Sequence, residues 1–388
     1  MHSNPSARTP HPIGRLATAP TCMGLALGLV IAWLGASPSQ ADPRNPGDEG
    51  THYRQIADIS VPTPNNALYG DIIYGDQQSG LVYFSDGSNS TVDVVNGRTD
   101  RLVAQVPVAG GPAGIVTDGY GQAWIGSGSG SIVVLKSTRP FTKIGAIPVG
   151  APTADEIAYD PRDHIIAVTS PDATDTKGRP TPWVTLIDAR PGHHRVLGHV
   201  VIPGAAADSI EQPQWNPASS TFVEAIRATT DFPNGEVAQI DPKAVRLQSV
   251  LPVDETCNPG GLAVGPNDEA LLGCNVGAPA LISLATGRVI HVYSGHDASG
   301  ADEVAYDAKD HRYYAAEAGA VGPPPNPQLN TPTVMVIDAH SRRFVTDIAL
   351  GPTALGFHQV TALFNPATVF VPQSDGIHVY TSLNKGKG

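Results

Sequence analysis

The stretch Ala154-Asp-Glu-Ile-Ala-Tyr-Asp-Pro-Arg-Asp-His164 returns almost unchanged as Ala301-Asp-Glu-Val-Ala-Tyr-Asp-Ala-Lys-Asp-His311. In each copy a short apolar strand leads into a turn that contains Asp. The same strand and turn pattern begins at five further residues, which are Asp71, Gly114, Gln212, Gly261 and Thr361. In the two quoted copies the equivalent starts are Glu156 and Glu303, so the seven starts are 43, 42, 56, 49, 42 and 58 residues apart. This spacing indicates a repeated small β-sheet that buries both faces only by stacking on its neighbours.

Further strands complete each repeat. A third strand ends in Asp or Asn, as in Val184-Thr-Leu-Ile-Asp188, and a fourth strand such as Leu102–Val108 follows. The last repeat, from Thr361 onward, supplies only three strands, whereas the strand Tyr53–Val61 at the other end of the chain has no partner. We therefore predict an all-β, seven-bladed β-propeller over residues 52–383. Its last blade is closed by the N-terminal strand, which leaves no exposed sheet edge.

Composition agrees with this fold class. Gly and Pro number 41 and 36 among 388 residues, which excludes long helices and with them helical bundles, coiled coils and helical solenoids. Apolar residues make up 41% of the chain, enough for a large core. The net charge of −12 argues against nucleic-acid binding, because that function requires a basic face.

The N-terminus has the pattern of a secretory signal peptide. Arg8 and Arg15 precede an apolar run over residues 23–34, and small residues stand at the end of the segment before a cleavage site after Ala41. The run is shorter than the roughly 20 apolar residues that span a bilayer comfortably. We predict a cleaved signal peptide over residues 1–41; an uncleaved anchor is the alternative.

The predicted product is a monomer without a stable membrane span, exported to a periplasm or secreted. Residues 42–51 are expected to be a flexible linker and residues 384–388 a tail. An exported compartment permits a disulfide between Cys257 and Cys274, which flank a predicted β-hairpin. Two buried thiols are the alternative.

A first family resemblance rests on the junctions between repeats. The segment from Asn96 to Val116 reads as a turn, a strand ending in Pro-Val and then Gly-Pro-Ala-Gly, and Asn258-Pro-Gly-Gly-Leu-Ala-Val-Gly-Pro follows the same pattern. These segments resemble the YVTN-type propeller repeat, which is also found in lactonase-like proteins. The resemblance implies the propeller fold, and it does not select an activity because propellers have many functions.

The residue before each inner strand separates the repeats into two kinds. Four repeats have small or apolar residues there: Gly70, Ala113, Gly260 and Val360. Three repeats have an acid, namely Asp155, Glu211 and Asp302. Equivalent positions of a propeller converge on the central channel, so three carboxylates would repel one another without a cation between them. We predict a divalent metal, with Ca²⁺ first and Mg²⁺ second. Acids that cap backbone N–H groups without any metal are the alternative.

A second, short resemblance agrees with the metal hypothesis. Glu211-Gln-Pro-Gln-Trp-Asn is similar to the Glu-Gly-Pro-x-Trp-Asp segment of the senescence-marker-protein and gluconolactonase family, which comprises six-bladed, metal-dependent hydrolases. The resemblance implies that Glu211 binds the metal and that the family's other ligands correspond to Asp155 and Asp302. Two features depart from the family, because Gln212 replaces its Gly and seven repeats replace its six blades.

Other polar residues of the junctions are further candidates. Asn258, two residues before Gly260, is a candidate neutral metal ligand; a turn residue is the alternative. His358 precedes the last inner strand, where it is a candidate general base or else a loop histidine bonded to backbone. Glu156 and Glu303 lie one residue further in and are candidates for the base or for outer ligands.

Two other features of the acidic repeats are expected to be structural or accessory. His164 and His311 follow the inner strands and are interpreted as turn residues. The Pro-rich insertions over residues 171–182 and 318–332 would form a rim over a pocket if they lie on the channel-mouth side. No Gly-x-Ser-x-Gly sequence is present, so an esterase nucleophile elbow is excluded.

Together these features predict an exported propeller with a divalent metal at the channel mouth. The first hypothesis is a metal-dependent hydrolase of a lactone or ester, in which the ion polarises the carbonyl or binds the attacking water. The alternative is a non-catalytic propeller that binds a small ligand or a protein partner at the mouth.

Overall fold

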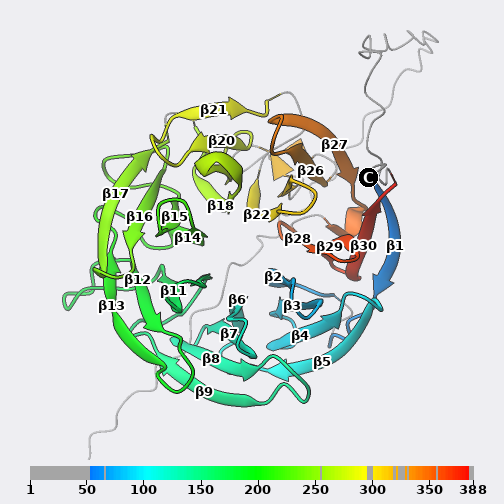
Figure 1. The fold of residues 1–388 in the computed structure, drawn as a ribbon, viewed down its shortest axis with the longest axis horizontal. Coiled ribbons are helices and arrows are strands. Elements are labelled where there is room, and N and C mark those ends of the chain that lie inside the picture. Colours follow the sequence, from blue (N-terminus) through cyan, green and yellow to red (C-terminus); the bar gives the residue numbers. More distant parts are fainter. Residues whose placement is uncertain are drawn as a thin grey trace, which may run out of the picture. The chain divides into compact units, whose positions relative to one another are not determined.

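The structure is a computed structural model that describes residues 53–64, 67–253, 256–294, 300–317, 320–321, 328–329, 332–354 and 357–383. The predicted signal peptide, the linker and the C-terminal tail lie outside these residues. Seven four-stranded antiparallel sheets form a ring around a central channel (Figure 1). The chain is therefore a seven-bladed β-propeller, as the repeat predicts.

The strands are given blade by blade, from the innermost strand outward. Blade one contains β2 (Gly70–Asp76), β3 (Leu81–Asp86), β4 (Thr91–Asn96) and β5 (Arg101–Pro107). Blade two contains β6 (Pro112–Thr117), β7 (Gln122–Ser127), β8 (Ser131–Lys136) and β9 (Lys143–Pro148). Blade three contains β10 (Ile157–Asp160), β11 (Ile165–Ser170), β12 (Trp183–Asp188) and β13 (Arg195–Val201). Blade four contains β14 (Ile210–Asn216), β15 (Thr221–Ile226), β16 (Glu236–Asp241) and β17 (Arg246–Pro252).

The remaining blades follow the same order. Blade five contains β18 (Pro259–Val264), β19 (Glu269–Cys274), β20 (Ala280–Ser283) and β21 (Val289–Val292). Blade six contains β22 (Ala301–Asp307), β23 (Arg312–Glu317), β26 (Thr333–Asp338) and β27 (Arg343–Ala349). Blade seven contains β28 (Thr361–Phe364), β29 (Ala367–Gln373), β30 (Gly376–Ser382) and β1 (Tyr53–Ile59). Four short elements lie outside the blades: β24 (Ala320–Val321), β25 (Gln328–Leu329), and the 3₁₀ turns η1 (Pro266–Asp268) and η2 (Pro352–Ala354).

The N-terminal strand closes the ring, as predicted. β1 pairs antiparallel with β30, in a register that joins Tyr53 to Ser382 and Ile59 to Ile377. It supplies the outer strand of blade seven, which the C-terminal part of the chain lacks. Ile59 also packs in the apolar cluster between blades seven and one, beside Ile73 and Val379. The closure therefore removes a sheet edge and completes an interface between blades.

The core consists of seven apolar clusters in the described residues, one between each pair of neighbouring blades. Middle strands such as β11 are buried along their whole length, because both faces of the blade are covered by the next blades. Each fully buried large apolar side chain contributes about 1.5–3 kcal/mol to folding. Outer strands such as β5 remain mostly exposed or half-buried. This difference explains why the middle strands are mostly apolar.

Acidic residues at strand ends form the turns. Asp160 accepts a hydrogen bond from the backbone N–H of Arg162 at 2.8 Å, and Asp307 accepts one from Lys309 at the same distance. Asn96, at the end of a third strand, accepts the N–H of Arg98 at 3.0 Å. A side chain that bonds the backbone two residues on stabilises a tight turn. The recurring Asp and Asn residues of the repeat therefore have a structural reason.

No helix in the described part of the chain is long and apolar enough to cross a membrane.

Candidate functional site

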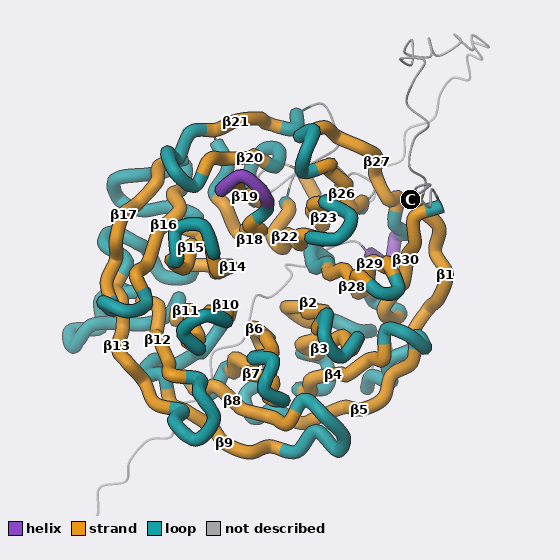
Figure 2. Tube along the Cα trace, in the orientation of Figure 1, coloured by secondary structure: helices purple, strands orange, loops and turns teal. Residues whose placement is uncertain are grey.

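The inner strands of all seven blades surround one cavity, which is the central channel (Figure 2). Its volume is about 420 Å³. We call the end at which the inner strands begin the junction end, and the end at which they turn outward the turn end. The acidic residues singled out by the sequence all precede or begin inner strands. The fold therefore places them at the junction end.

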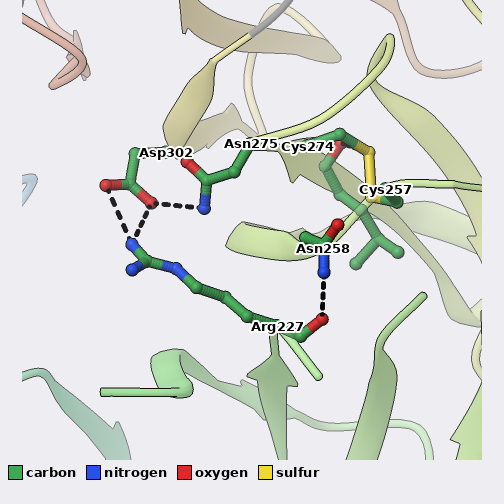
Figure 3. Close-up of a disulfide and its surroundings, with 7 residues drawn as sticks. Arg227, Cys257, Asn258, Cys274, Asn275 and Asp302 are labelled. Atoms are coloured by element: carbon green, nitrogen blue, oxygen red, sulfur yellow. Dashed lines mark hydrogen bonds and ion pairs between the residues drawn. A yellow bond between two sulfur atoms is a disulfide. The ribbon is translucent and has the colours of Figure 1, made fainter. Parts of the chain in front are cut away.

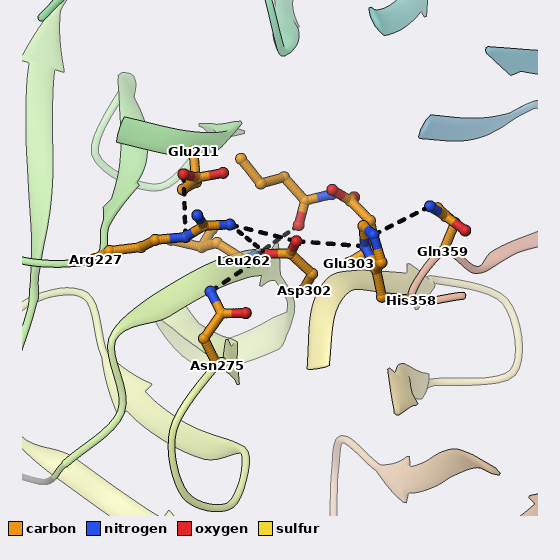
Figure 4. Close-up of polar contacts among 9 residues, drawn as sticks. Glu211, Arg227, Leu262, Asn275, Asp302, Glu303, His358 and Gln359 are labelled. Atoms are coloured by element: carbon orange, nitrogen blue, oxygen red, sulfur yellow. Dashed lines mark hydrogen bonds and ion pairs between the residues drawn. The ribbon is translucent and has the colours of Figure 1, made fainter. Parts of the chain in front are cut away.

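Arg227 lies between two of the three predicted junction acids. It directly follows β15, and its Nε lies 3.1 Å from Oε1 of Glu211 in the same blade. Its terminal nitrogen donates to both carboxylate oxygens of Asp302 in blade six, at 3.2 and 3.4 Å. Figure 4 shows the guanidinium between the two carboxylates. The protein's own cation therefore joins Glu211 and Asp302.

Asp302 reaches Arg227 by crossing blade five. A Cβ atom at Gly260 would overlap the Asp302 carboxylate, so the space above this junction is open only because the residue is glycine. The Asn275 side chain donates to Asp302 Oδ1 at 3.5 Å. Blade five has Gly260 at the position where the acidic blades have a carboxylate. The missing side chain leaves room for Asp302 of blade six.

His358 lies on the opposite side of Asp302 from Arg227 (Figure 4). Its Nδ1 is 3.3 Å from Asp302 Oδ2, and its Nε2 is 3.4 Å from the side-chain nitrogen of Gln359. The backbone carbonyl of His358 accepts the N–H of Glu303 at 3.1 Å. A chain of contacts therefore runs from Glu211 through Arg227 and Asp302 to His358, across blades four, six and seven.

Asp155 is the third predicted junction acid. Among the described residues, its side chain makes no hydrogen bond or ion pair with the residues that connect Glu211 to His358. Its backbone N–H donates to Thr169 O at 2.9 Å, and its carbonyl accepts the N–H of Gly114 at 3.2 Å. Burial, followed by the nearby charges of Asp71 and Asp172, raises the pKa of Asp155 to about 8. Asp172 belongs to the 171–182 insertion and accepts a hydrogen bond from the Thr153 hydroxyl at 2.7 Å. This insertion therefore lies at the junction end, beside Asp155.

Glu156 and Glu303 lie one residue further into the channel and line the cavity. Their exposed fractions are 7% and 6%. Burial first, and then neighbouring carboxylates, raise the pKa of each well above its usual value. Glu303 accepts a hydrogen bond from Gln212 Nε2 at 2.6 Å, and the carbonyl oxygen of that amide accepts the N–H of Leu262 at 2.6 Å.

Asn258 stands outside the acidic cluster, and its side chain orders the backbone behind Arg227. Its amide nitrogen donates to the carbonyl of Arg227 at 2.9 Å. Cys257 and Cys274, the residues before Asn258 and Asn275, form a disulfide (Figure 3). The bond therefore links the two segments that contact Arg227 and Asp302, and it decides between the two states that the sequence left open for these cysteines.

The mouth has a large excess of negative charge. Six carboxylates face or border it: Asp71, Asp155, Glu156, Glu211, Asp302 and Glu303. Burial raises the pKa of Glu211 to about 9 despite Arg227, because Asp302, Asp155 and Asp71 add negative charge nearby. Burial also raises the pKa of Asp71, against the opposing effect of His358. The mouth is therefore poised to take up protons or a cation.

Two kinds of chemistry are open to this arrangement. Carboxylate oxygens are the donors that Ca²⁺ and Mg²⁺ take, and Asp155, Glu211 and Asp302 would supply them. Among the described residues, no three His, Cys, Asp or Glu side chains are already arranged around a metal position. His358 Nδ1 lies 3.3 Å from Asp302 Oδ2 without forming a hydrogen bond, so a general-base role would require this contact to tighten.

The turn-end histidines have structural contacts. His164 pairs through its two ring nitrogens with the hydroxyls of Tyr159 and Tyr120 at 2.9 and 3.2 Å, and His311 pairs with Tyr306 at 3.3 Å. Both lie at the opposite end of the channel from the acids. The second insertion, over residues 318–332, lies largely outside the described residues.

Sequence reasoning missed two residues of the mouth. Asp71 occupies the same position in blade one that Glu156 and Glu303 occupy in their blades, so the repeat itself contained the signal. Arg227 follows a second strand rather than an inner one, and no repeated position marks it. The available signal for Arg227 was that the junction acids need a cation between them. We considered only a metal ion as that cation.

Comparisons with known proteins establish the fold. No family model and no curated protein matches the chain. Among solved structures 1533 chains match, so the fold is too widely shared to select a function. One, a chain of the crystal structure of the mitotic checkpoint complex, has a TM-score of 0.60 at 12% sequence identity and covers 92% of this chain and 99% of that chain. The YVTN and gluconolactonase resemblances receive no support from these matches and stay expectations from short motifs.

Proposed function

We propose that the protein binds a small cation at the junction-end mouth of its channel, with Ca²⁺ as the first candidate. The observation that carries the proposal is the charge imbalance. Six carboxylates share the mouth, whereas Arg227 is the only permanent cation that lowers the pKa of any of them in the described residues. It already contacts Glu211 and Asp302. Asp71, Asp155 and Glu156 have no such pair.

Burial makes this imbalance costly. Ionised carboxylates that lose water without gaining a partner are unfavourable, and mutual repulsion adds to the cost. A divalent cation supplies two positive charges and accepts several oxygen donors at once. Its binding would therefore release protons held by Asp155 and Glu211 and remove the repulsion.

Hydrolysis of a lactone or ester is a second candidate, favoured by the contacts of His358. The imidazole lies 3.3 Å from Asp302, close enough for this carboxylate to orient a general base once the contact tightens on substrate binding. Arg227, on the same carboxylate, supplies positive charge near the place where an oxyanion would form. A bound Ca²⁺ would add Lewis acidity at this mouth.

A calcium titration followed by a substrate panel tests both candidates. The purified chain is titrated with CaCl₂ by calorimetry at pH 8, as wild type, Asp155→Asn and Glu211→Gln. We expect binding in the wild type and an affinity about tenfold lower in each variant, because each loses a charged ligand. Asp347→Asn removes the same charge from an exposed position of the outer strand β27 and should leave binding unchanged.

Two results would oppose the proposals separately. Absence of a saturable calcium signal in the wild type, together with no divalent ion in the purified protein, would remove the metal. Calcium binding without turnover of any γ- or δ-lactone or aryl ester would leave a binding protein. If turnover is found, His358→Ala should abolish it while leaving calcium binding in place.

A further inference from the structure

The two ends of the channel differ in chemistry. At the junction end the cavity is lined by Glu156, Gln212 and Glu303. At the turn end it is lined by aromatic side chains from five blades: Tyr74, Tyr159, Trp215, Tyr306 and Phe364. A site for a bare inorganic ion needs only the first set. The aromatic residues at the turn end would therefore be available to contact a larger ligand than an inorganic ion.

Glu156 is a polar residue of the cavity wall whose carboxylate has no partner among the described residues. Its side chain is 7% exposed and lines the cavity, and it has no hydrogen bond or ion pair within the described part of the chain. Gln212 directs its amide to other groups, because its Nε2 donates to Glu303 and its Oε1 accepts the N–H of Leu262. A buried carboxylate without a partner is unfavourable unless something in the cavity supplies positive charge.

The aromatic end is held in place by hydrogen bonds outside the cavity. The hydroxyls of Tyr159 and Tyr306 bond the turn histidines at 2.9 and 3.3 Å, and Tyr74 bonds the Thr117 hydroxyl at 3.3 Å. The polar tips of these rings are thus satisfied at the turn end, while the rings pack against the apolar clusters between blades and also line the channel. Aromatic surface binds apolar groups and attracts cations.

The spacing of the two ends sets the size of a ligand. Glu156 directly precedes β10, and Tyr159 lies three residues further on within it, which corresponds to about 10 Å along the channel at the usual rise of a strand. A cavity of about 420 Å³ lies in the range of small-molecule sites. A molecule with a charged group at one end and an apolar body some 10 Å long would reach both.

We propose that the channel binds an organic ammonium ion with an apolar or aromatic body. The ammonium group lies between Glu156 and Glu303, and the body lies against the aromatic side chains of the turn end. This inference rests on the proposed cation binding and deepens it by naming the ligand class. It differs from calcium binding in requiring the aromatic end.

Calorimetry with matched probes tests the inference on the full chain. 4-Phenylbutylamine carries both features, 4-phenylbutan-1-ol lacks the charge, and n-butylamine lacks the ring. We expect the aromatic amine to bind about tenfold more tightly than either, since each analogue loses one of the two interactions. Glu156→Gln should weaken the aromatic amine about tenfold, and Tyr306→Leu should weaken it while leaving n-butylamine unchanged. Asp347→Asn is the control.

The outcomes separate this inference from the proposed function. Equal affinity for the amine and the alcohol, or an unchanged affinity in Glu156→Gln, would overturn the inference. Calcium binding without amine binding would overturn it and leave the proposed function standing. Absence of both would remove both. Circular dichroism of each variant establishes that it is folded, and Glu303→Gln provides a second charge variant should Glu156→Gln fail to fold.

Discussion

Glu156 and Gln212 occupy the same position of neighbouring inner strands, yet only one of them has a partner. Gln212 donates to Glu303 and accepts from the backbone of Leu262. Glu156 differs by one oxygen in place of a nitrogen, and burial, followed by the charges of neighbouring carboxylates, raises its pKa. A single-atom difference therefore separates a satisfied channel residue from an unsatisfied one.

Replacing Glu156 by glutamine should stabilise the ligand-free protein. The substitution keeps the shape of the side chain and removes a group that must stay protonated or remain unpaired in the folded state. We expect the free energy of unfolding at pH 8 to rise by about 1–3 kcal/mol. Urea denaturation measures it, with Asp347→Asn expected to stay within about 0.5 kcal/mol of the wild type. A less stable Glu156→Gln protein would show that the carboxylate has a favourable partner.

The candidate site was only partly predictable at the scale of single residues. Glu211 and Asp302 were found because a repeat makes equivalent positions comparable, and the structure brings these two together. Their link through Arg227 could not be predicted, because it depends on how far Asp302 reaches over Gly260. Contacts across blades depend on side-chain direction, which a repeat pattern does not contain.

The hairpin of β18 and β19 connects the site to the rest of blade five. Pro259 pairs with Cys274 at its open end, and the disulfide to Cys257 closes the same end. Asn258 and Asn275, each next to a cysteine, contact Arg227 and Asp302. A bond of this kind persists in an oxidising compartment.

Removing the disulfide should destabilise the protein without unfolding it. The Cys257→Ser and Cys274→Ser double variant loses the constraint on a loop of 17 residues' separation, worth about 3 kcal/mol. Guanidinium denaturation of the double variant and of the oxidised wild type measures the loss. Reduced wild type should unfold at the same denaturant concentration as the variant. Equal midpoints for the variant and the oxidised protein would mean that the bond does not constrain the unfolded chain.

At the scale of the whole molecule, the fold was predictable because every blade repeats the same pattern of strands and turns. Apolar inner strands, Asp or Asn turns and a spare N-terminal strand each occur at the expected place, and the ring closes through β1 and β30. Strand ends moved by about one residue, as when the predicted Leu102–Val108 became β5 (Arg101–Pro107). Because the pattern occurs seven times, an error in one strand end does not change the predicted fold. The mouth is formed by residues at which the repeats differ, so the repeat does not predict its contacts.

The mouth should make the stability of the whole ring depend on pH. Burial raises the pKa of Asp155 to about 8 and that of Glu211 to about 9, from ordinary values of 3.8 and 4.5. Between about pH 4 and pH 9 the folded protein therefore holds more protons than the unfolded chain, so the free energy of unfolding falls as pH rises. Urea midpoints at pH 5, 7 and 9 should decrease in that order. The double variant Asp155→Asn, Glu211→Gln should show a flatter profile, and saturating CaCl₂ should restore stability at pH 9 in the wild type alone. A wild-type midpoint that is constant or rises toward pH 9 would mean that these carboxyls are ionised at little cost, and that the mouth has no unmet need for a cation.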